Sequence, residues 1–198
     1  LHKPVRVEVS PPSTTVERIE QRVHFVDKPD KRALLTEILR DESIERTLVF
    51  TRTKHGADRV VRHLAARGVP AAALHGNKSH GQRERALAAF RNGDVRVLVA
   101  TDIAARGLDV PGNTHVINFD VPNIPESDVH RIGRTARAGR DGVAISFCDG
   151  EERAYLRDIE RDIRRSLDVV GVAPKSGAPK SGAPKSGAPA RRTRTSQA

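Results

Sequence analysis

Four arginines stand close together in one short segment of the chain. The segment HRIGRTARAGR at 130–140 holds Arg131, Arg134 and Arg137 at intervals of three residues, and Arg140 follows. Guanidinium groups at this density repel one another unless an anion lies among them, and each presents a planar fork of donors that suits phosphate oxygens. A solvated basic face is the alternative. Because the segment follows a buried strand and a second polar motif, we favour a phosphate-binding site.

The second motif, TDIAARGLDV, stands at 101–110 directly after an apolar run. Thr101 and Asp102 together indicate the start of a helix, and helix N-termini bind anions. Asp102 taken alone is more often a simple N-cap. Asp109, shortly before Pro111, is typical of a turn when the motif is left aside. From the residues alone, the helix start is therefore the part of this motif that favours an anionic ligand.

Short apolar runs alternate with segments of helical periodicity along most of the chain. Strands are expected at 21–26, 47–51, 71–74, 96–100, 115–119 and 143–147. Helices are expected from 27–30 to 40, at 54–67, from 79 to 91, at 127–137 and from 149 to 167. This alternation argues for an α/β fold with a parallel sheet that helices cover on both faces.

Local signals mark several of the expected helix ends. Ser79 and Gln82 have the spacing of a capping box ahead of the helix that runs to about 91, and Gly93 ends that helix. Asp149 and Glu152 have the same spacing ahead of the last helix. Both helices should therefore begin close to these residues.

Polar segments follow four of the expected strands. They are Thr51–Lys54, His75–Lys78, Thr101–Arg106 and Asp120–Asn123. Ligands of parallel α/β sheets bind outside the carboxyl ends of the strands, so the four segments should share one edge of the domain. Threonine, lysine, glycine, asparagine and arginine side by side on that edge suit a phosphate-rich partner.

The motifs at 101–110 and 130–140 together resemble motifs V and VI of the DEAD-box RNA helicases. The segments FTRTKHGA at 50–57 and HGNK at 75–78 are most similar to the RhlE-type bacterial branch, and the resemblance extends from Gln21 to Leu167. It implies the second, carboxy-terminal RecA-like lobe of a two-lobed RNA helicase that depends on ATP. The first lobe is not in this chain.

The resemblance implies ATP-facing roles for several residues. Arg134 and Arg137 match the arginine fingers that reach the ATP phosphates, where they would offset the charge of the transition state. Asp109 matches the acid that accepts hydrogen bonds from the ribose hydroxyls, and Gly107 is also counted among the cofactor-binding residues. A role in coupling the two lobes is implied for His130 and Arg131.

The resemblance also implies contacts with the RNA backbone. The residues concerned are Thr53, Gly76, Arg83, Thr101 and Arg106. Arg83 matches the arginine of a Q-x-x-R motif, but the position of the motif's glutamine is His80 here. A histidine can still donate a hydrogen bond, and its charge varies near neutral pH.

Several motifs of a complete helicase do not occur in the sequence. It contains no GxxxxGK[ST], no D-E-A-D and no S-A-T. The Walker lysine and the carboxylates that bind Mg²⁺ are therefore expected in the absent amino-terminal lobe, and no metal site is expected in this chain. We predict that the chain alone does not hydrolyse ATP.

The composition limits the partners. The chain has 198 residues and a net charge of +10, and the segment 171–198 holds six basic residues and no acid. Basic tails commonly bind nucleic acid, although anionic membrane surfaces also attract them. Tryptophan is absent and there is one tyrosine, so RNA should be held by its backbone rather than by stacked bases. With a single cysteine and no long apolar run, a soluble cytoplasmic protein without a membrane segment is expected.

Three regions are expected. Residues 1–20 read as a linker or edge segment, 21–170 as the RecA-like domain, and 171–198 as a disordered basic tail that repeats APKSG. The tail is either an electrostatic RNA tether or a linker that preserves solubility. The excess of arginine over lysine hints at a GC-rich bacterial genome.

Two other functions stay open. The chain could be a lobe of a DNA-directed superfamily 2 motor, although such branches usually vary the two long motifs. It could also be a non-catalytic RNA-binding module, although Arg134, Arg137 and Asp109 would then have no use.

Overall fold

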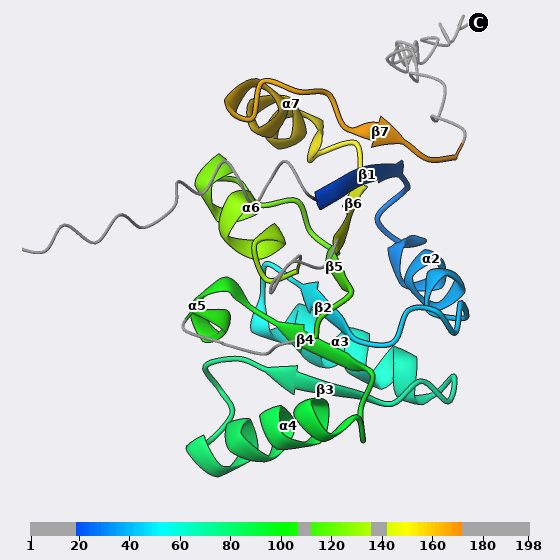
Figure 1. Cartoon of the computed structure of the whole chain (residues 1–198), viewed down its shortest axis with the longest axis vertical. Coiled ribbons are helices and arrows are strands. Elements are labelled where there is room, and N and C mark those ends of the chain that lie inside the picture. The colour runs from blue at the N-terminus through cyan, green and yellow to red at the C-terminus, as the bar shows by residue number, and fades with distance from the viewer. Residues whose placement is uncertain (1–18, 107–111, 136–141, 172–198) are drawn as a thin grey trace, which may run out of the picture.

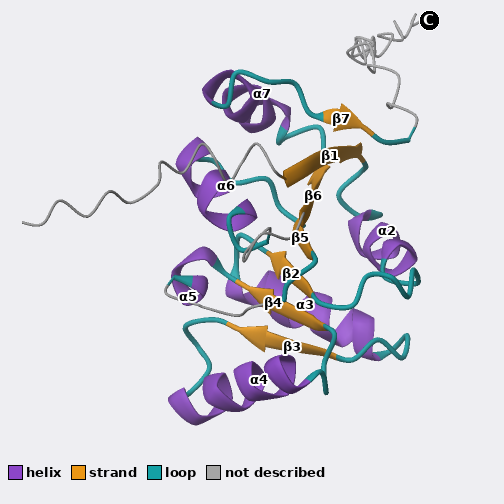
Figure 2. Ribbon diagram, in the orientation of Figure 1, coloured by secondary structure: helices purple, strands orange, loops and turns teal. Residues whose placement is uncertain are grey.

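The strands among the described residues all lie parallel in one sheet. The computed structural model describes residues 19–106, 112–135 and 142–171. Its seven-stranded sheet has the order β3-β4-β2-β5-β6-β1-β7, with helices on both faces (Figures 1 and 2). This confirms the predicted RecA-like α/β fold. The tail at 172–198 and the leading residues 1–18 lie outside the described residues, so the expectations for them stay predictions.

The elements follow the predicted alternation. The strands are β1 Ile19–Phe25, β2 Thr47–Phe50, β3 Ala71–Leu74, β4 Val97–Ala100, β5 His115–Asn118, β6 Gly142–Cys148 and β7 Asp168–Val169. The helices are α2 Lys31–Ile38, α3 Lys54–Ala65, α4 His80–Asn92, α5 Asp102–Ala105, α6 Pro125–Ile132 and α7 Arg153–Asp162.

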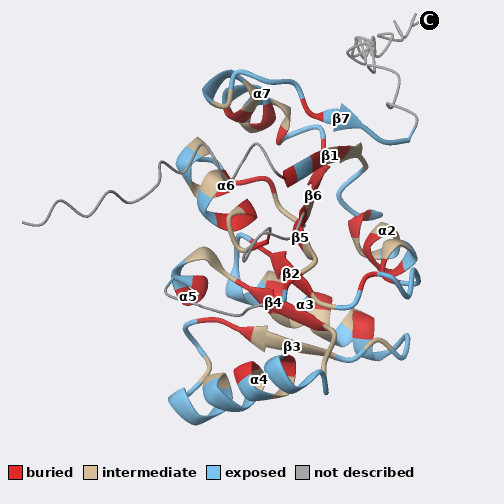
Figure 3. Ribbon diagram, viewed as in Figure 1, coloured by how far each residue is buried: buried red, intermediate tan, exposed pale blue. Residues whose placement is uncertain are grey.

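The central strands are buried on both faces because helices cover each side (Figure 3). Val49 of β2 packs in one cluster with α2 and α3, whereas its neighbour Leu48 packs in another with α4 and α5. In β6, Ile145 belongs to the α2–α3 side, and Ala144 packs against α6 on the other side. Successive side chains of a strand point to opposite faces, so the continuous apolar runs of the sequence fit a sheet covered twice.

The helix caps agree with the sequence in the first half of the chain. Ser79 accepts a hydrogen bond from the backbone of Gln82, and the Gln82 side chain accepts one from the backbone of Ser79, as a capping box requires. Gly93 closes α4 in the left-handed conformation with a φ of 86°, which glycine adopts without steric cost. The predicted bounds of α4 are confirmed to within a residue.

The helix predicted at 127–137 is shorter than expected. In the structure α6 begins at Pro125 and ends at Ile132. The hydroxyl of Thr135 is buried and donates to the carbonyls of Asn113 and Thr114 at 2.9 and 3.1 Å, which draws the chain toward the start of β5. The prediction of a helix through Arg134 was therefore wrong.

The last helix also ends early. It was predicted to reach 167, but α7 ends at Asp162, and Arg164 has a positive φ of 54°. The chain then forms β7, which pairs with β1 and which the sequence did not indicate. The Glu160 carboxylate accepts a hydrogen bond from the backbone of Leu167 and stabilises this change of direction.

None of the helices in the described part of the chain has the length and apolar character that a membrane span requires.

Candidate functional site

Four polar loops meet at one edge of the sheet. The segments Thr51–Lys54, His75–Lys78, Thr101–Arg106 and Asp120–Asn123 follow β2, β3, β4 and β5. These four strands are consecutive neighbours in the sheet and all run parallel. The predicted convergence of the loops on one edge, which we call the rim, is confirmed.

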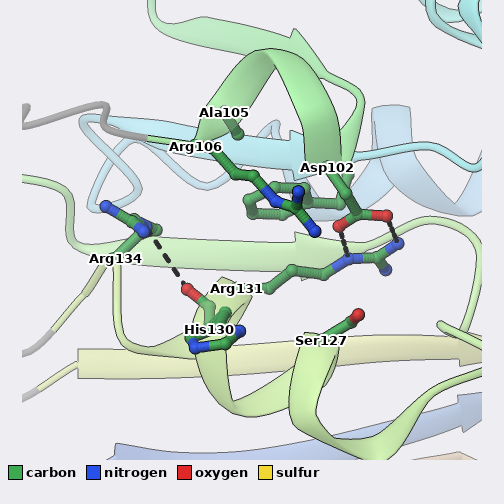
Figure 4. A pocket seen from close by; sticks show the side chains of 8 residues that line it. Asp102, Ala105, Arg106, Ser127, His130, Arg131 and Arg134 are labelled. Carbon is green, nitrogen blue, oxygen red and sulfur yellow. Dashed lines mark hydrogen bonds and ion pairs between the residues drawn. The ribbon is translucent and has the colours of Figure 1, made fainter.

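A hollow of about 300 Å³ lies between α5 and α6. Its walls carry the side chains of Phe50, Asp102, Ala105, Arg106, Ser127, His130, Arg131 and Arg134 (Figure 4). Only one of these, Asp102, is an acid. The hollow therefore brings Arg106 of one predicted motif beside His130 and Arg134 of the other.

Arg131 is held inside the domain by four hydrogen bonds. Its Nε and Nη2 donate to the two carboxylate oxygens of Asp102 at 2.6 and 2.8 Å (Figure 4). Its Nη1 donates to the side chain of Asn118 at 3.0 Å and to the carbonyl of Asp120 at 2.8 Å. The guanidinium also lies 5.1 Å from the centre of the Phe50 ring. The anion beside this arginine is thus a carboxylate of the chain itself, which the spacing of arginines did not reveal.

Arg134 has a different setting from Arg131. It lies just past the end of α6, is half-buried, and donates from Nε to the carbonyl of His130 at 3.3 Å (Figure 4). Its side chain lines the hollow. The other residues with predicted ATP-facing roles lie outside the described residues: Gly107, Asp109 and Arg137.

A buried carboxyl group of α6 joins this helix to β5. Asp128 is 3% exposed and accepts a hydrogen bond from Nδ2 of Asn118 at 2.7 Å. Asn118 Nδ2 also donates to the hydroxyl of Ser146 at 3.1 Å. Burial raises the pKa of Asp128 to about 6, although the nearby Arg131 charge and the Asn118 hydrogen bond favour the ionised form. Nothing in the sequence separates this aspartate from a surface residue of the first helical turn.

The replacement Asp128→Asn should change how stability depends on pH. In the folded protein the pKa of Asp128 is about 6, above the value of about 3.9 expected when the chain is unfolded. In the folded state the Asp128 carboxylate therefore takes up a proton as the pH falls through 6, while in the unfolded state it stays ionised until the pH nears 4. Between pH 7 and pH 5 the parent should gain about 1 kcal/mol relative to the variant. Urea unfolding of both proteins at the two pH values measures this difference, and parallel shifts would contradict it.

Several of the residues with predicted RNA contacts lie at the start of a helix on the rim. Thr53 is the N-cap of α3, and its hydroxyl accepts a hydrogen bond from the backbone of Gly56 at 3.0 Å. Thr101 is the N-cap of α5 but makes no such side-chain bond. Arg83 lies in the first turn of α4, and its buried Nε has no hydrogen-bond partner among the described residues. His80, in place of the motif glutamine, is exposed at the first position of α4.

The loop after β3 is fastened to α3 by its side chains. His75 is buried, and its Nδ1 accepts from the backbone of Asn77 at 3.3 Å, so its Nε2 donates to Asp58 at 3.0 Å. Lys78 pairs with the same carboxylate at 3.0 Å, and Lys54 donates to the Asn77 side chain at 3.0 Å. These contacts attach the loop to α3 and leave Gly76 exposed.

Gly76 at the tip of this loop is not required by the packing of the domain. A Cβ atom added there would meet nothing within 4 Å, and its φ is not in the left-handed region. By contrast, a Cβ on Gly133 would stand 3.1 Å from the carbonyl of Val129. The space above Gly76 is open to a ligand.

Among the described residues, no group of histidine, cysteine, aspartate or glutamate could hold a metal ion.

Comparisons with known proteins agree with this geometry. The family model of the helicase conserved C-terminal domain matches residues 30–139. The DEAD-box ATP-dependent RNA helicase CshA of Bacillus subtilis is 45% identical over 166 residues, which cover 84% of this chain and 34% of that protein. CshA of Geobacillus kaustophilus is 43% identical over 168 residues, covering 85% of this chain and 36% of the relative.

Solved structures show the same fold. The E. coli DEAD-box protein SrmB, bound to regulator of ribonuclease activity A, aligns with a TM-score of 0.76 and 36% identity, covering 82% of this chain and 98% of that one. Dbp5 of S. cerevisiae bound to RNA and ADP BeF3 aligns with a TM-score of 0.75 and 32% identity, over 83% of this chain and 44% of that one. The chain spans about a third of the length of the curated relatives that it matches.

Proposed function

Because the chain belongs to the family of helicase conserved C-terminal domains, those of DEAD-box RNA helicases, we propose that it is the carboxy-terminal lobe of an ATP-dependent RNA helicase. The parent remodels RNA by opening short duplexes locally when its two lobes close on ATP and RNA. The amino-terminal lobe supplies the Walker lysine and the ligands of Mg²⁺. This lobe supplies RNA contacts and arginines.

One observation carries the proposal. The rim and the hollow between α5 and α6 adjoin each other, because Thr101 follows β4 on the rim and is the N-cap of α5, which forms one wall of the hollow. A nucleic-acid backbone and a nucleotide phosphate could therefore be bound side by side. A binding module alone would need only the rim.

RNA is held at the rim by its phosphates and sugars. The Thr101 hydroxyl, which makes no cap hydrogen bond, can donate to a phosphate oxygen. Arg106 is exposed on the same loop, and Gly76 offers open space for close approach. Arg83 and Thr53 complete the proposed contacts. The polar backbone contacts imply little choice of RNA sequence.

The arginines beyond α6 face the ATP of the other lobe. Arg134 lies on the wall of a hollow whose other polar groups include Arg106 and His130. These side chains suit phosphate oxygens and not a metal ion, which supports placing the Mg²⁺ ligands on the other lobe. Arg137, Asp109 and Gly107 are proposed to complete the nucleotide contacts, and His130 with Arg131 to couple the lobes.

The replacement Gly76→Ala should weaken RNA binding without changing stability. The added methyl group meets no atom of the domain, so the free energy of unfolding should stay within about 0.5 kcal/mol of the parent. The same methyl group would hold an RNA backbone away from the loop, and we expect the affinity for single-stranded RNA to fall several-fold. Fluorescence anisotropy with a labelled oligonucleotide at fixed salt measures the affinity.

Gly150→Ala is the matched control for this replacement. Gly150 also follows a strand, and a Cβ added there likewise meets nothing within 4 Å, but it lies outside the proposed RNA contacts. Its affinity for RNA should equal that of the parent. Equal affinities of all three proteins would remove Gly76 from the RNA site.

Two alternatives are distinguished by simple assays of the two-lobed parent. Stronger stimulation of ATP turnover by DNA than by RNA would favour a DNA-directed motor. RNA binding without any ATP turnover would favour a non-catalytic module. The relatives named above come from bacteria, which supports a bacterial helicase, and a cytoplasmic location stays a proposal. The RhlE-like branch is also kept as a proposal, on the segments at 50–57 and 75–78.

A further inference from the structure

A second hollow opens at the same edge, on the opposite face of the sheet from α5 and α6. It measures about 330 Å³ and lies between the N-terminal ends of α2 and α3. We call it the α2–α3 cleft, and the residues used below are Lys28, Lys31, Arg32, Arg52, Thr53 and Arg59. A volume of this size can take the phosphate and sugar of a nucleotide.

Three of the five cations in the cleft are neutralised by the chain. Lys31 is fully buried and pairs with Glu152 and with Asp149. Arg52 pairs with Glu152 at 2.9 Å and also donates to a backbone carbonyl at 3.0 Å. Lys28 pairs with an exposed glutamate at 3.0 Å. These contacts fix the walls of the cleft and leave those three side chains little charge to offer.

Arg32 and Arg59 are different. Among the residues that the structure describes, neither guanidinium has a hydrogen bond or an ion pair. Arg32 also lies in the first turn of α2, where a positive charge is unfavourable because the N-terminal end of a helix is itself positive. Neither α2 nor α3 carries an acid in its first turn. The cleft is also lined by one carboxylate, Asp120, which accepts a hydrogen bond from the backbone of Arg52 at 2.8 Å. Two arginines without an ion pair and two helix N-termini therefore face one cleft.

The position of the cleft suggests what binds there. Thr53 borders the cleft and is also one of the proposed RNA contacts on the rim, so the two sites are continuous. We propose that the α2–α3 cleft binds backbone phosphates of an RNA segment that continues beyond the rim, with Arg32 and Arg59 as its contacts. This inference rests on the proposed function and extends the RNA track to the other face of the sheet.

The test compares a short single-stranded RNA, which covers only the rim, with the same RNA lengthened at either end. The double replacement Arg32→Ala/Arg59→Ala should leave the short RNA unaffected. For the longer RNA it should lower the affinity by up to about tenfold, as expected for two solvent-accessible ion pairs. It should also reduce the slope of log affinity against log salt by about 1.4, since each phosphate contact on a single strand contributes about 0.7.

The double replacement Arg40→Ala/Arg62→Ala is the matched control. It also removes two positive charges, but near the C-terminal ends of the same two helices and outside the cleft. Both variants lose two positive charges and keep the basic tail, so the non-specific attraction of the protein for RNA should change equally in the two. Thermal unfolding checks that all the proteins are folded.

A loss of affinity that is confined to the longer RNA and to the Arg32→Ala/Arg59→Ala variant supports the inference. Equal affinities of the two variants would overturn it, and the cleft would then suit an acidic segment of a partner protein. A parent that binds neither RNA would instead remove the proposed function, and a rim variant such as Gly76→Ala that weakens both RNAs alike would show the rim to be sound.

Discussion

Replacing Arg131 by alanine should lower the free energy of unfolding by about 3 kcal/mol. The side chain is 2% exposed and makes four hydrogen bonds to three residues, Asp102, Asn118 and Asp120. Its removal leaves the buried side chain of Asn118 without one partner and takes the nearest positive charge from buried Asp128. Polar groups left unsatisfied in the interior cost more than the lost bond alone.

Two further variants show whether this loss belongs to the buried network. Arg131→Lys keeps the charge but cannot bridge both oxygens of Asp102 and reach Asn118 as well, so an intermediate loss is expected. Arg134→Ala removes an arginine one turn later that is only half-buried, and it should cost less than about 1 kcal/mol. Urea denaturation of the three variants gives the comparison. Equal losses for Arg131→Ala and Arg134→Ala would mean that the network does not stabilise the domain.

Arg134→Ala should have its large effect on catalysis instead. In the two-lobed parent we expect RNA-stimulated ATP turnover to fall by about 10³-fold or more, the range seen when an arginine finger is removed from a GTPase. The physical reason is that the guanidinium would offset charge on the phosphoryl oxygens mainly in the transition state. ATP binding should be largely kept, so the maximal rate should fall more than the apparent affinity for ATP. Arg137→Ala should behave in the same way.

The controls separate charge from geometry. Arg134→Lys keeps the charge without the planar fork and should recover only part of the rate. The isolated chain should give no turnover, since it contains neither the GxxxxGK[ST] motif with the Walker lysine nor the D-E-A-D carboxylates that bind Mg²⁺. Unchanged turnover in Arg134→Ala would contradict a role at the transferring phosphate and would assign the arginine to contacts with RNA or with a partner.

The parts of the fold that depend on local pattern could be predicted from the sequence. The β2 and β4 runs are buried along their whole length, as continuous apolar strands should be. The capping box of Ser79 and the left-handed Gly93 fixed both ends of α4. The helix expected at 54–67 is present as α3, and Val60 and Leu64, one turn apart on it, are buried. The convergence of four loops on the rim followed from the parallel sheet alone.

The parts that depend on distant contacts could not be predicted. The pair between Asp102 and Arg131 joins residues 29 positions apart, and the helix at 125–132 ends early because Thr135 bonds to carbonyls 21 and 22 positions away. The α2–α3 cleft is assembled from three separate segments. The basic residues were visible in the sequence, but which of them the domain neutralises is decided only by folding.

The ion pair between Arg131 and Asp102 also connects the rim to the hollow between α5 and α6. Asp102 immediately follows Thr101 on the rim, and Arg131 lies one turn before Arg134 beside the hollow. Because this ion pair ties the start of α5 to α6, the two helices should move together. A displacement of Thr101 on the rim would then also displace Arg134 beside the hollow. Communication between RNA and ATP within this lobe would then pass through a guanidinium that touches neither ligand.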